Sequence, residues 1–169
     1  MEIKRIKGKN NMKFIYDIDS VVREIHKPIE EKFNFKIKHW SYIYKGKDFW
    51  DMINTMPEIW LNASPTEYYP IIKEQKDLEF WTVQREENKE STINWLNKHF
   101  PKYKVKFFKD FEHKYKAVQK NNVILIDDFP NFPSYESIVL IDRNYNKNTH
   151  AKIRVTTPKK LQIVLDKYL

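Results

Sequence analysis

Two short apolar stretches of this sequence run directly into acidic residues. The first, residues 12–16, is followed by Asp17 and, two positions later, by Asp19. The second, residues 123–128, ends in two adjacent aspartates. In open α/β sheets ligands bind beyond the carboxyl ends of the strands, so two buried parallel strands of this kind would bring their carboxylates to one sheet edge. We therefore predict a site for a hard divalent cation. One such motif alone is more often a solvent-exposed acidic turn, but the pair favours the metal site.

Composition narrows the chemistry that the chain can perform. With 169 residues it is long enough for one domain, with room for an inserted subdomain. It contains no cysteine, which excludes disulfides, thiolate catalysis and thiolate metal sites. The five histidines are scattered without an HExxH-like pair, so we do not expect zinc. The sequence has no run of about 18 apolar residues and no apolar leader, and we expect a soluble cytoplasmic protein without membrane contact.

The formal net charge of +8 fits an anionic partner, such as a phosphate ester or a nucleic acid. The lysines are spread along the whole chain, however, and most of them fit a solvated surface equally well. The charge therefore gives only weak support for nucleic acid binding.

Residues 1–11 are expected to form a basic N-terminal tail, which is either frayed or added to the sheet as an edge strand.

Strand-like and helix-like segments alternate along the rest of the chain. Apolar or alternating patterns predict further strands at residues 78–82, 103–108 and 138–141. Helical patterns predict helices at residues 21–33, 67–75, 86–99, 110–117 and 158–168. Strands that alternate with helices imply a parallel sheet with right-handed crossovers. The predicted fold class is therefore α/β, with a Rossmann-like parallel sheet.

Residues 33–60 interrupt this alternation with a high density of aromatic side chains. Apolar residues recur at helical spacing between positions 49 and 56, so we predict a small, mostly helical insertion after the first strand. Most of its aromatic residues are expected to form its own core. A lid of this kind beside a metal site could also bind a base or another flat ring. The candidates for that role are Trp40, Tyr42, Tyr44 and Phe49, whereas Trp50 and Trp60 are assigned to the core.

A hydroxyl group stands at the end of the second predicted strand. Thr82 ends that strand, and Arg85 follows three positions later. A hydroxyl at the carboxyl end of a parallel strand can donate to a phosphate oxygen, and a nearby guanidinium can add a charge-assisted hydrogen bond. Taken alone, Thr82 would more often be an ordinary strand end.

The order of these motifs resembles the four-motif pattern of the haloacid dehalogenase-like phosphatase superfamily. The pattern consists of Asp17-Ile-Asp19 after a strand, Thr82 after a second strand, a lysine before a third, and the Leu-Ile-Asp127-Asp128 ending of that third strand. The sequence is most similar to the 5′(3′)-deoxyribonucleotidase-like branch. That similarity rests on the LIDD ending, the position of the insertion, and Tyr145-Asn146 followed by Arg154-Val155. It covers nearly the whole chain beyond the N-terminal tail.

The resemblance implies a domain organisation. Residues 12–21 and 71–169 would form the catalytic core, a Rossmann-like sheet with helices, and residues 22–70 would form a small helical cap inserted after the first strand.

The resemblance also implies roles for single residues. Asp17 would be the nucleophile that forms an aspartyl-phosphate, and Asp19 would protonate the leaving group and later activate water. Magnesium would be held by the Asp17 carboxylate, the Asp19 backbone carbonyl and Asp128, with Asp127 as a further or indirect ligand. Thr82 would position a phosphoryl oxygen. A lysine would neutralise charge on the phosphoryl group, and Lys114 fits the spacing better than Lys116.

Two positions depart from the family pattern. Ser20 stands where the superfamily usually has glycine, so either it adopts a strained backbone close to the phosphate or the pocket differs. Residues 129–131 read Phe-Pro-Asn where the nucleotidases often have a basic residue. These departures bear on the substrate more than on the chemistry.

The sequence therefore predicts a magnesium-dependent phosphomonoesterase that acts on deoxynucleoside monophosphates. One alternative is a phosphatase for polynucleotide 3′ or 5′ ends, which the positive charge favours. Another is a non-catalytic, basic nucleic-acid-binding protein on the same scaffold.

Overall fold

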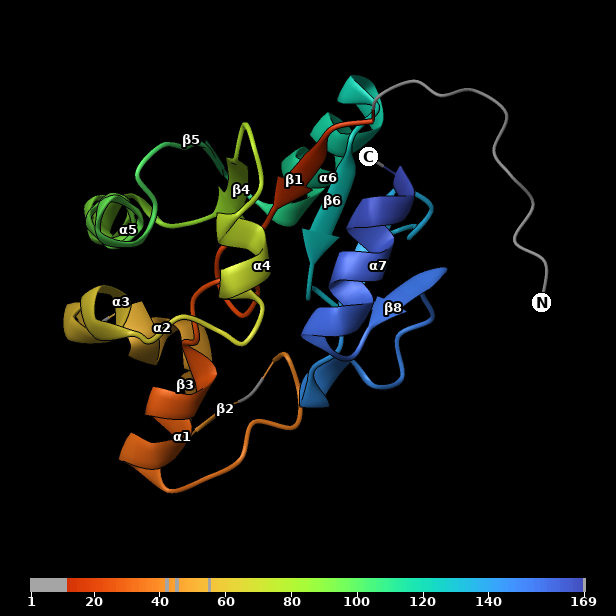
Figure 1. Cartoon of the computed structure of the whole chain (residues 1–169). Coiled ribbons are helices and arrows are strands. Elements are labelled where there is room, and N and C mark those ends of the chain that lie inside the picture. Colours follow the sequence, from red (N-terminus) through yellow and green to blue (C-terminus); the bar gives the residue numbers. More distant parts are fainter. Residues whose placement is uncertain (1–11, 42, 45, 55, 169) are drawn as a thin grey trace.

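Six parallel strands form the central sheet of the protein (Figure 1). The computed structural model describes residues 12–41, 43–44, 46–54 and 56–168. The strand order is β5 (Lys104–Phe108), β4 (Glu79–Val83), β1 (Phe14–Tyr16), β6 (Ile124–Asp127), β7 (Ile138–Ile141) and β8 (Ile153–Val155). All neighbouring pairs in it are parallel. The predicted α/β class with a parallel sheet is therefore confirmed.

Helices cover both faces of the sheet. Successive side chains of β1 point to opposite faces, so Phe14 and Tyr16 belong to one apolar cluster and Ile15 to another. The first cluster includes residues of α4 (Tyr69–Lys73), α5 (Glu86–His99) and α7 (Pro158–Tyr168), and the second includes residues of α6 (Phe111–Asn121). In Figure 1, α4 and α7 lie in front of the sheet and α6 lies behind it. The central strand is thus held by packing on both sides.

Some element boundaries differ from the prediction for local reasons. The helix predicted at residues 21–33 begins only at α1 (His26–Phe33), because residues 18–23 form a tight hydrogen-bonded turn. Helix α4 is shorter than the predicted 67–75, and α6 extends beyond residue 117. Strand β8 and the 3₁₀-helix η1 (Asn144–Asn146) are absent from the prediction. Segments of three residues are too short to show a periodic pattern.

The segment between β1 and β4 contains short helices and a hairpin. Helix α1 is followed by β2 (Ile43–Tyr44), β3 (Lys47–Asp48), α2 (Phe49–Asn54) and α3 (Pro57–Asn62). The helical spacing predicted over residues 49–56 corresponds to α2, which ends at Asn54, and a second helix begins at Pro57. The segment has an apolar cluster of its own, made by Ile25, Ile29, Ile37, Ile53, Ile59, Trp60 and Ala63. Trp95 of α5 donates its Nε1–H to the carbonyl of Ala63 over 2.7 Å and so ties the segment to the sheet domain.

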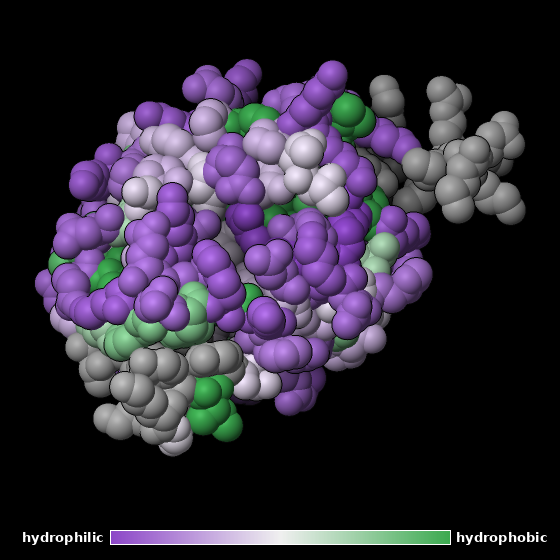
Figure 2. Space-filling view, turned by 90° about the horizontal axis from the view of Figure 1, so that it is seen from below, coloured by the Kyte–Doolittle hydropathy of each residue, from purple (hydrophilic) through white to green (hydrophobic). Residues whose placement is uncertain are grey.

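The surface at this end of the molecule is mostly hydrophilic. Figure 2 shows polar side chains over most of the face seen from below, with small hydrophobic patches. The exposed large apolar side chains of the described residues are scattered, namely Ile43, Leu61, Ile93 and Ile163. None of the described helices combines the length and the apolar character needed to cross a membrane.

Candidate functional site

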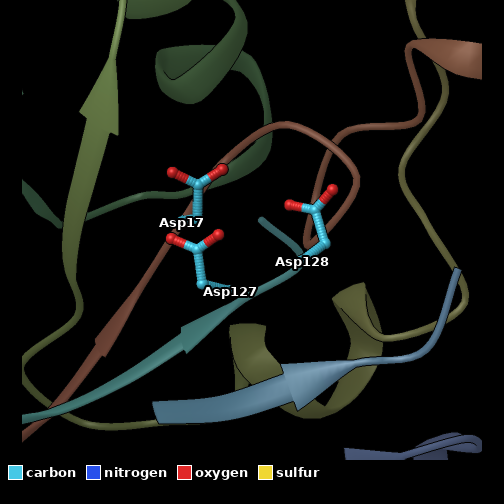
Figure 3. A group of neighbouring side chains, drawn as sticks. All are labelled: Asp17, Asp127 and Asp128. Carbon is cyan, nitrogen blue, oxygen red and sulfur yellow. The ribbon is translucent and has the colours of Figure 1, made fainter. Parts of the chain in front are cut away.

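The two acidic motifs meet at one edge of the sheet. Strands β1 and β6 are parallel neighbours in which Tyr16 pairs with Ile126, so the residues after them begin at the same level. Asp17, Asp127 and Asp128 are buried there, and their carboxylates each place an oxygen within 4.8 Å of the others (Figure 3). These three residues are called the carboxylate cluster below. Burial of three acids side by side demands compensation by positive charge.

Lys114 supplies that compensation from α6. Its side chain is completely buried, and its ammonium donates to Asp17 Oδ1 and, over 2.6 Å, to Asp127 Oδ2. Burial alone would lower the pKa of Lys114, but the carboxylates of Asp127 and Asp17 outweigh it and raise the pKa above its usual value. Lys116 is exposed instead and pairs with Glu112 on its own helix. The structure therefore brings Lys114, and not Lys116, to the cluster.

One lysine does not neutralise three carboxylates. Burial, followed by repulsion from Asp127 and Asp128, raises the pKa of Asp17 well above its usual value despite the contact with Lys114. Burial and the neighbouring Asp127 raise the pKa of Asp128 to about 7. Both shifts show that burial and the neighbouring acids disfavour the charged carboxylates, a cost that a bound cation would relieve.

The oxygen atoms of the cluster are not all equally available to a metal. Asp127 accepts from Lys114 with one oxygen and from the Phe129 N–H, over 2.8 Å, with the other. Asp128 Oδ2 accepts from the hydroxyl of Tyr145. Among the described residues, no hydrogen bond is made to Asp17 Oδ2 or Asp128 Oδ1. Two hard carboxylate oxygens from neighbouring strands, with a third acid beside them, fit a cation of the magnesium class.

The loop after β7 holds Asp128 in place through hydrogen bonds. The amide of Asn146 donates over 2.8 Å to the backbone carbonyls of both Asp128 and Ile141. Its own oxygen accepts from Arg154 over 3.1 Å. Tyr145 precedes it in η1 and contacts the Asp128 carboxylate. Tyr145 is missing from the predicted site residues, although its Tyr-Asn element is part of the pattern that suggests the resemblance.

Ser20 adopts the backbone conformation that its position demands. Its φ is 62°, in the left-handed region that usually favours glycine. The strain is offset by contacts, because its carbonyl accepts from Arg143 Nε over 3.0 Å and its hydroxyl lies 2.6 Å from His26 Nδ1. Ser20 is buried and is not among the residues that line the neighbouring cavity. Ser20 therefore contacts other side chains of the protein and does not line the cavity.

A cavity of about 310 Å³ opens beside the carboxylate cluster. Its polar lining includes Asp17, Asp19, Thr82, Gln84, Asn88, Asp127 and Asp128, together with the cationic Arg85 and Lys109. Thr82 is buried one residue before the end of β4, the strand next to β1. Arg85 is exposed, and its guanidinium pairs over 2.5 Å with Asp51 of α2. The lining is thus acidic after β1 and β6 and carries cations in the segments that follow β4 and β5.

Aromatic rings form the other wall of the cavity. Trp40 and Trp50 both line it, half-buried, with ring centres 5.1 Å apart. Trp40 also packs edge-on against Phe111 and Phe129 of the sheet domain. Trp50 packs against the apolar cluster of its own segment, as predicted, and it also lines the cavity. Trp60 is buried, as predicted, and forms part of the wall.

The remaining ring candidates cannot be placed in the same way. Tyr42 lies outside the described residues. Tyr44 and Phe49 belong to β2 and α2, but their side chains are outside the described part of the structure.

Asp19 points to partners outside the carboxylate cluster. Its carboxylate accepts from Arg23 Nε over 2.7 Å and from the amide of Gln84. Neither partner is among the predicted site residues. Arg23 follows Asp19 by four positions. That spacing predicts an ion pair only where the backbone is helical or tightly turned, and the sequence alone does not show the turn at residues 18–23.

Comparison with known proteins adds no further identification. No protein-family model matches the sequence, and no curated protein gives a match.

Replacing Lys114 with methionine tests the charge balance of the site. The variant would leave the three buried acids without their cation, so we expect the metal-free protein to lose about 3–5 kcal/mol of unfolding free energy. Lys116→Met on the same helix is the matched control and should change stability by less than about 0.5 kcal/mol. Urea denaturation at neutral pH measures both values, and equal losses in the two variants would contradict the assignment.

Proposed function

We propose that this protein is a magnesium-dependent phosphomonoesterase of the haloacid dehalogenase-like type, acting on deoxynucleoside monophosphates. The observation that carries the proposal is the carboxylate cluster with its buried Lys114 at the ends of β1 and β6. Thr82, at the end of the adjacent β4, faces the same cavity. A carboxylate held by a buried ammonium, with a hydroxyl lining the same cavity, supports phosphoryl transfer, which needs its reacting and charge-neutralising groups close together.

In the first half of the proposed reaction, Asp17 attacks the phosphorus atom. A bond forms between the Asp17 carboxylate oxygen and phosphorus, while the bond from phosphorus to the ester oxygen breaks. The leaving oxygen keeps the electron pair and takes a proton from Asp19. In the second half, water attacks the phosphorus of the aspartyl-phosphate and gives its proton to Asp19. Inorganic phosphate leaves, and the Asp17 carboxylate is restored.

The other residues hold and neutralise the phosphoryl group. Lys114 already contacts Asp17, so its ammonium lies where negative charge gathers during the attack. Thr82 would donate its hydroxyl hydrogen to a phosphoryl oxygen. Asp17, Asp128 and the backbone carbonyl of Asp19 would hold magnesium, with Asp127 fixed beside them by Lys114. When bound, the metal screens the carboxylates and the phosphate from each other.

The aromatic wall supports a nucleotide as the substrate. The proposed phosphate contacts carry no information about the rest of the molecule, so a preference for a base must come from other side chains. Trp40 and Trp50 line the cavity beside the strand ends, and an aromatic ring that stacks on a base contributes about 1–3 kcal/mol. Residues 22–70 would then act as the cap of the proposed enzyme.

A polynucleotide end is the second candidate substrate. Arg85 and Lys109 line the cavity and could contact further phosphates. Turnover of a mononucleotide should depend weakly on salt, whereas binding that neutralises many phosphates falls steeply as salt increases. The same measurement separates the enzyme from a non-catalytic nucleic-acid-binding protein.

Phosphate release with magnesium tests the proposed activity directly. We expect release from deoxynucleoside monophosphates to exceed release from sugar phosphates and phosphorylated oligonucleotides. Asp17→Asn should reduce turnover to background while the fold remains intact, because an amide cannot act as the nucleophile. Near wild-type turnover in a folded Asp17→Asn protein would refute the mechanism.

Thermal unfolding tests the metal site without relying on activity. The pKa of Asp128 is raised in the folded state, so the metal-free protein should lose stability as the pH rises from about 4 towards 8. At pH 8, Asp128→Asn should therefore unfold at a higher temperature than the wild type without metal. Magnesium should raise the midpoint of the wild type and raise that of this variant much less.

Asp110→Asn is the matched control for the metal site. Asp110 is an exposed acid that caps α6 and does not line the cavity. This variant should keep the full effect of magnesium. An equal magnesium effect in Asp128→Asn would contradict the role of Asp128 as a ligand.

Trp40→Ala tests whether the aromatic wall recognises the base. We expect kcat/KM for the preferred nucleotide to fall about ten-fold or more, with little change for a small aryl phosphate. Phe35→Ala is the control, because Phe35 packs in the cluster of the same segment and does not line the cavity. A lower melting temperature with an unchanged ratio of the two activities would show that Trp40 serves only as core.

A further inference from the structure

Arg23 is a completely buried arginine beside the proposed site. Its guanidinium lies over two tryptophan rings, 4.8 Å from the centre of Trp60 and 5.6 Å from that of Trp95. A buried charge is costly unless it is paired and hydrogen-bonded. The partners of this guanidinium therefore indicate what it does.

The guanidinium contacts three separate parts of the protein. Arg23 Nε donates to Asp19 Oδ1 over 2.7 Å, in the loop after β1. One terminal nitrogen donates to the carbonyl of Trp60 in α3 over 3.3 Å, and the other to the hydroxyl of Thr92 in α5 over 3.2 Å. The two terminal nitrogens and the rings anchor the side chain, which leaves Nε directed at Asp19.

Gln84 holds the second oxygen of the same carboxylate. It follows β4, lines the cavity, and donates its amide to Asp19 Oδ2. The carboxylate of Asp19 is thus fixed from two sides, by Arg23 within the core and by Gln84 at the cavity. A carboxyl group that donates a proton must keep its reactive oxygen within about 3 Å of the leaving group, so its orientation matters for the rate.

We propose that Arg23, together with Gln84, is a positioning residue for Asp19 in phosphoester cleavage. This inference rests on the proposed function. Arg23 has only hydrogen-bond donors, so it holds Asp19 Oδ1 as an acceptor. Asp19 Oδ2, on the side of the cavity-lining Gln84, is therefore the oxygen left to meet the leaving group. Gln84 can accept from a protonated Oδ2 if its amide turns over, because an amide offers both a donor and an acceptor.

Two aryl phosphates that differ in leaving group test this role. Phenol is a much weaker acid than 4-nitrophenol, so phenyl phosphate needs protonation of its leaving oxygen and 4-nitrophenyl phosphate needs it far less. The value of kcat/KM reports the steps up to departure of the leaving group. With magnesium present, Arg23→Lys should lower kcat/KM for phenyl phosphate about ten-fold or more and for 4-nitrophenyl phosphate less than about three-fold.

Thr92→Val is the matched structural control. It removes a different hydrogen bond of Arg23 and does not touch Asp19. It should lower the melting temperature while the ratio of the two kcat/KM values stays at the wild-type value. A ratio that changes as much as in Arg23→Lys would assign the effect to loosened packing and overturn the proposal.

Gln84→Leu tests the same positioning role at a half-buried position. If Arg23→Lys does not fold, this variant alone provides the test. It should change the ratio in the same direction as Arg23→Lys. Equal losses on both esters in the folded variants would overturn the positioning role and leave the proposed function standing. A wild-type protein that hydrolyses neither ester, nor any nucleotide, would instead refute the proposed function and the positioning role together.

Discussion

The contact of the Lys114 ammonium with two buried carboxylates is the interaction on which the candidate site depends. Asp17 and Asp127 come from neighbouring strands and would repel each other in a medium of low polarity. The lysine reaches them from α6, on the face of the sheet where Ile15 and Val118 are also packed. Its position is therefore set by the packing of a whole helix against the sheet. The site can be acidic and buried only because this helix carries a cation at that point.

A single lysine leaves the cluster with excess negative charge. The raised pKa values of Asp17 and Asp128 express the same imbalance, because burial and neighbouring acids disfavour their charged forms. A structure that only needed stability would have fewer acids at this point. Such an arrangement is common at functional sites, where binding of a cation or a substrate recovers the lost stability. The proposed metal would relieve this excess, and the proposed phosphate chemistry depends on that screening.

Hydrogen bonds hold the two loops that carry the carboxylate cluster. The loop after β1 is held by Arg23, by the contact of Arg143 with the Ser20 carbonyl, and by backbone hydrogen bonds within its tight turn. The loop after β6 is held by Asn146, which bridges Asp128 and Ile141. The aromatic wall, in contrast, is shared between two parts of the chain. Trp40 and Trp50 follow β1 and pack on each other, and Trp40 also packs against Phe111 of α6. Any preference for a substrate would then depend on how the segment between β1 and β4 docks on the sheet domain.

The sequence by itself determined the features that depend on neighbouring residues. Local periodicity predicts the strands that end in acids and their alternation with helices. It also predicts the bounds of α5 and α7, because the hydrogen bonds of a helix join residues close together in the sequence. The spacing implied by the resemblance favoured Lys114 over Lys116, but residues two apart on a helix point in different directions, and the packing of α6 shows that Lys114 is the buried one. The partners of Asp19 and Asp128 were likewise decided by the tertiary structure. Gln84 is 65 residues from Asp19 and Tyr145 is 17 residues from Asp128, and no local pattern links positions that meet only when the chain folds.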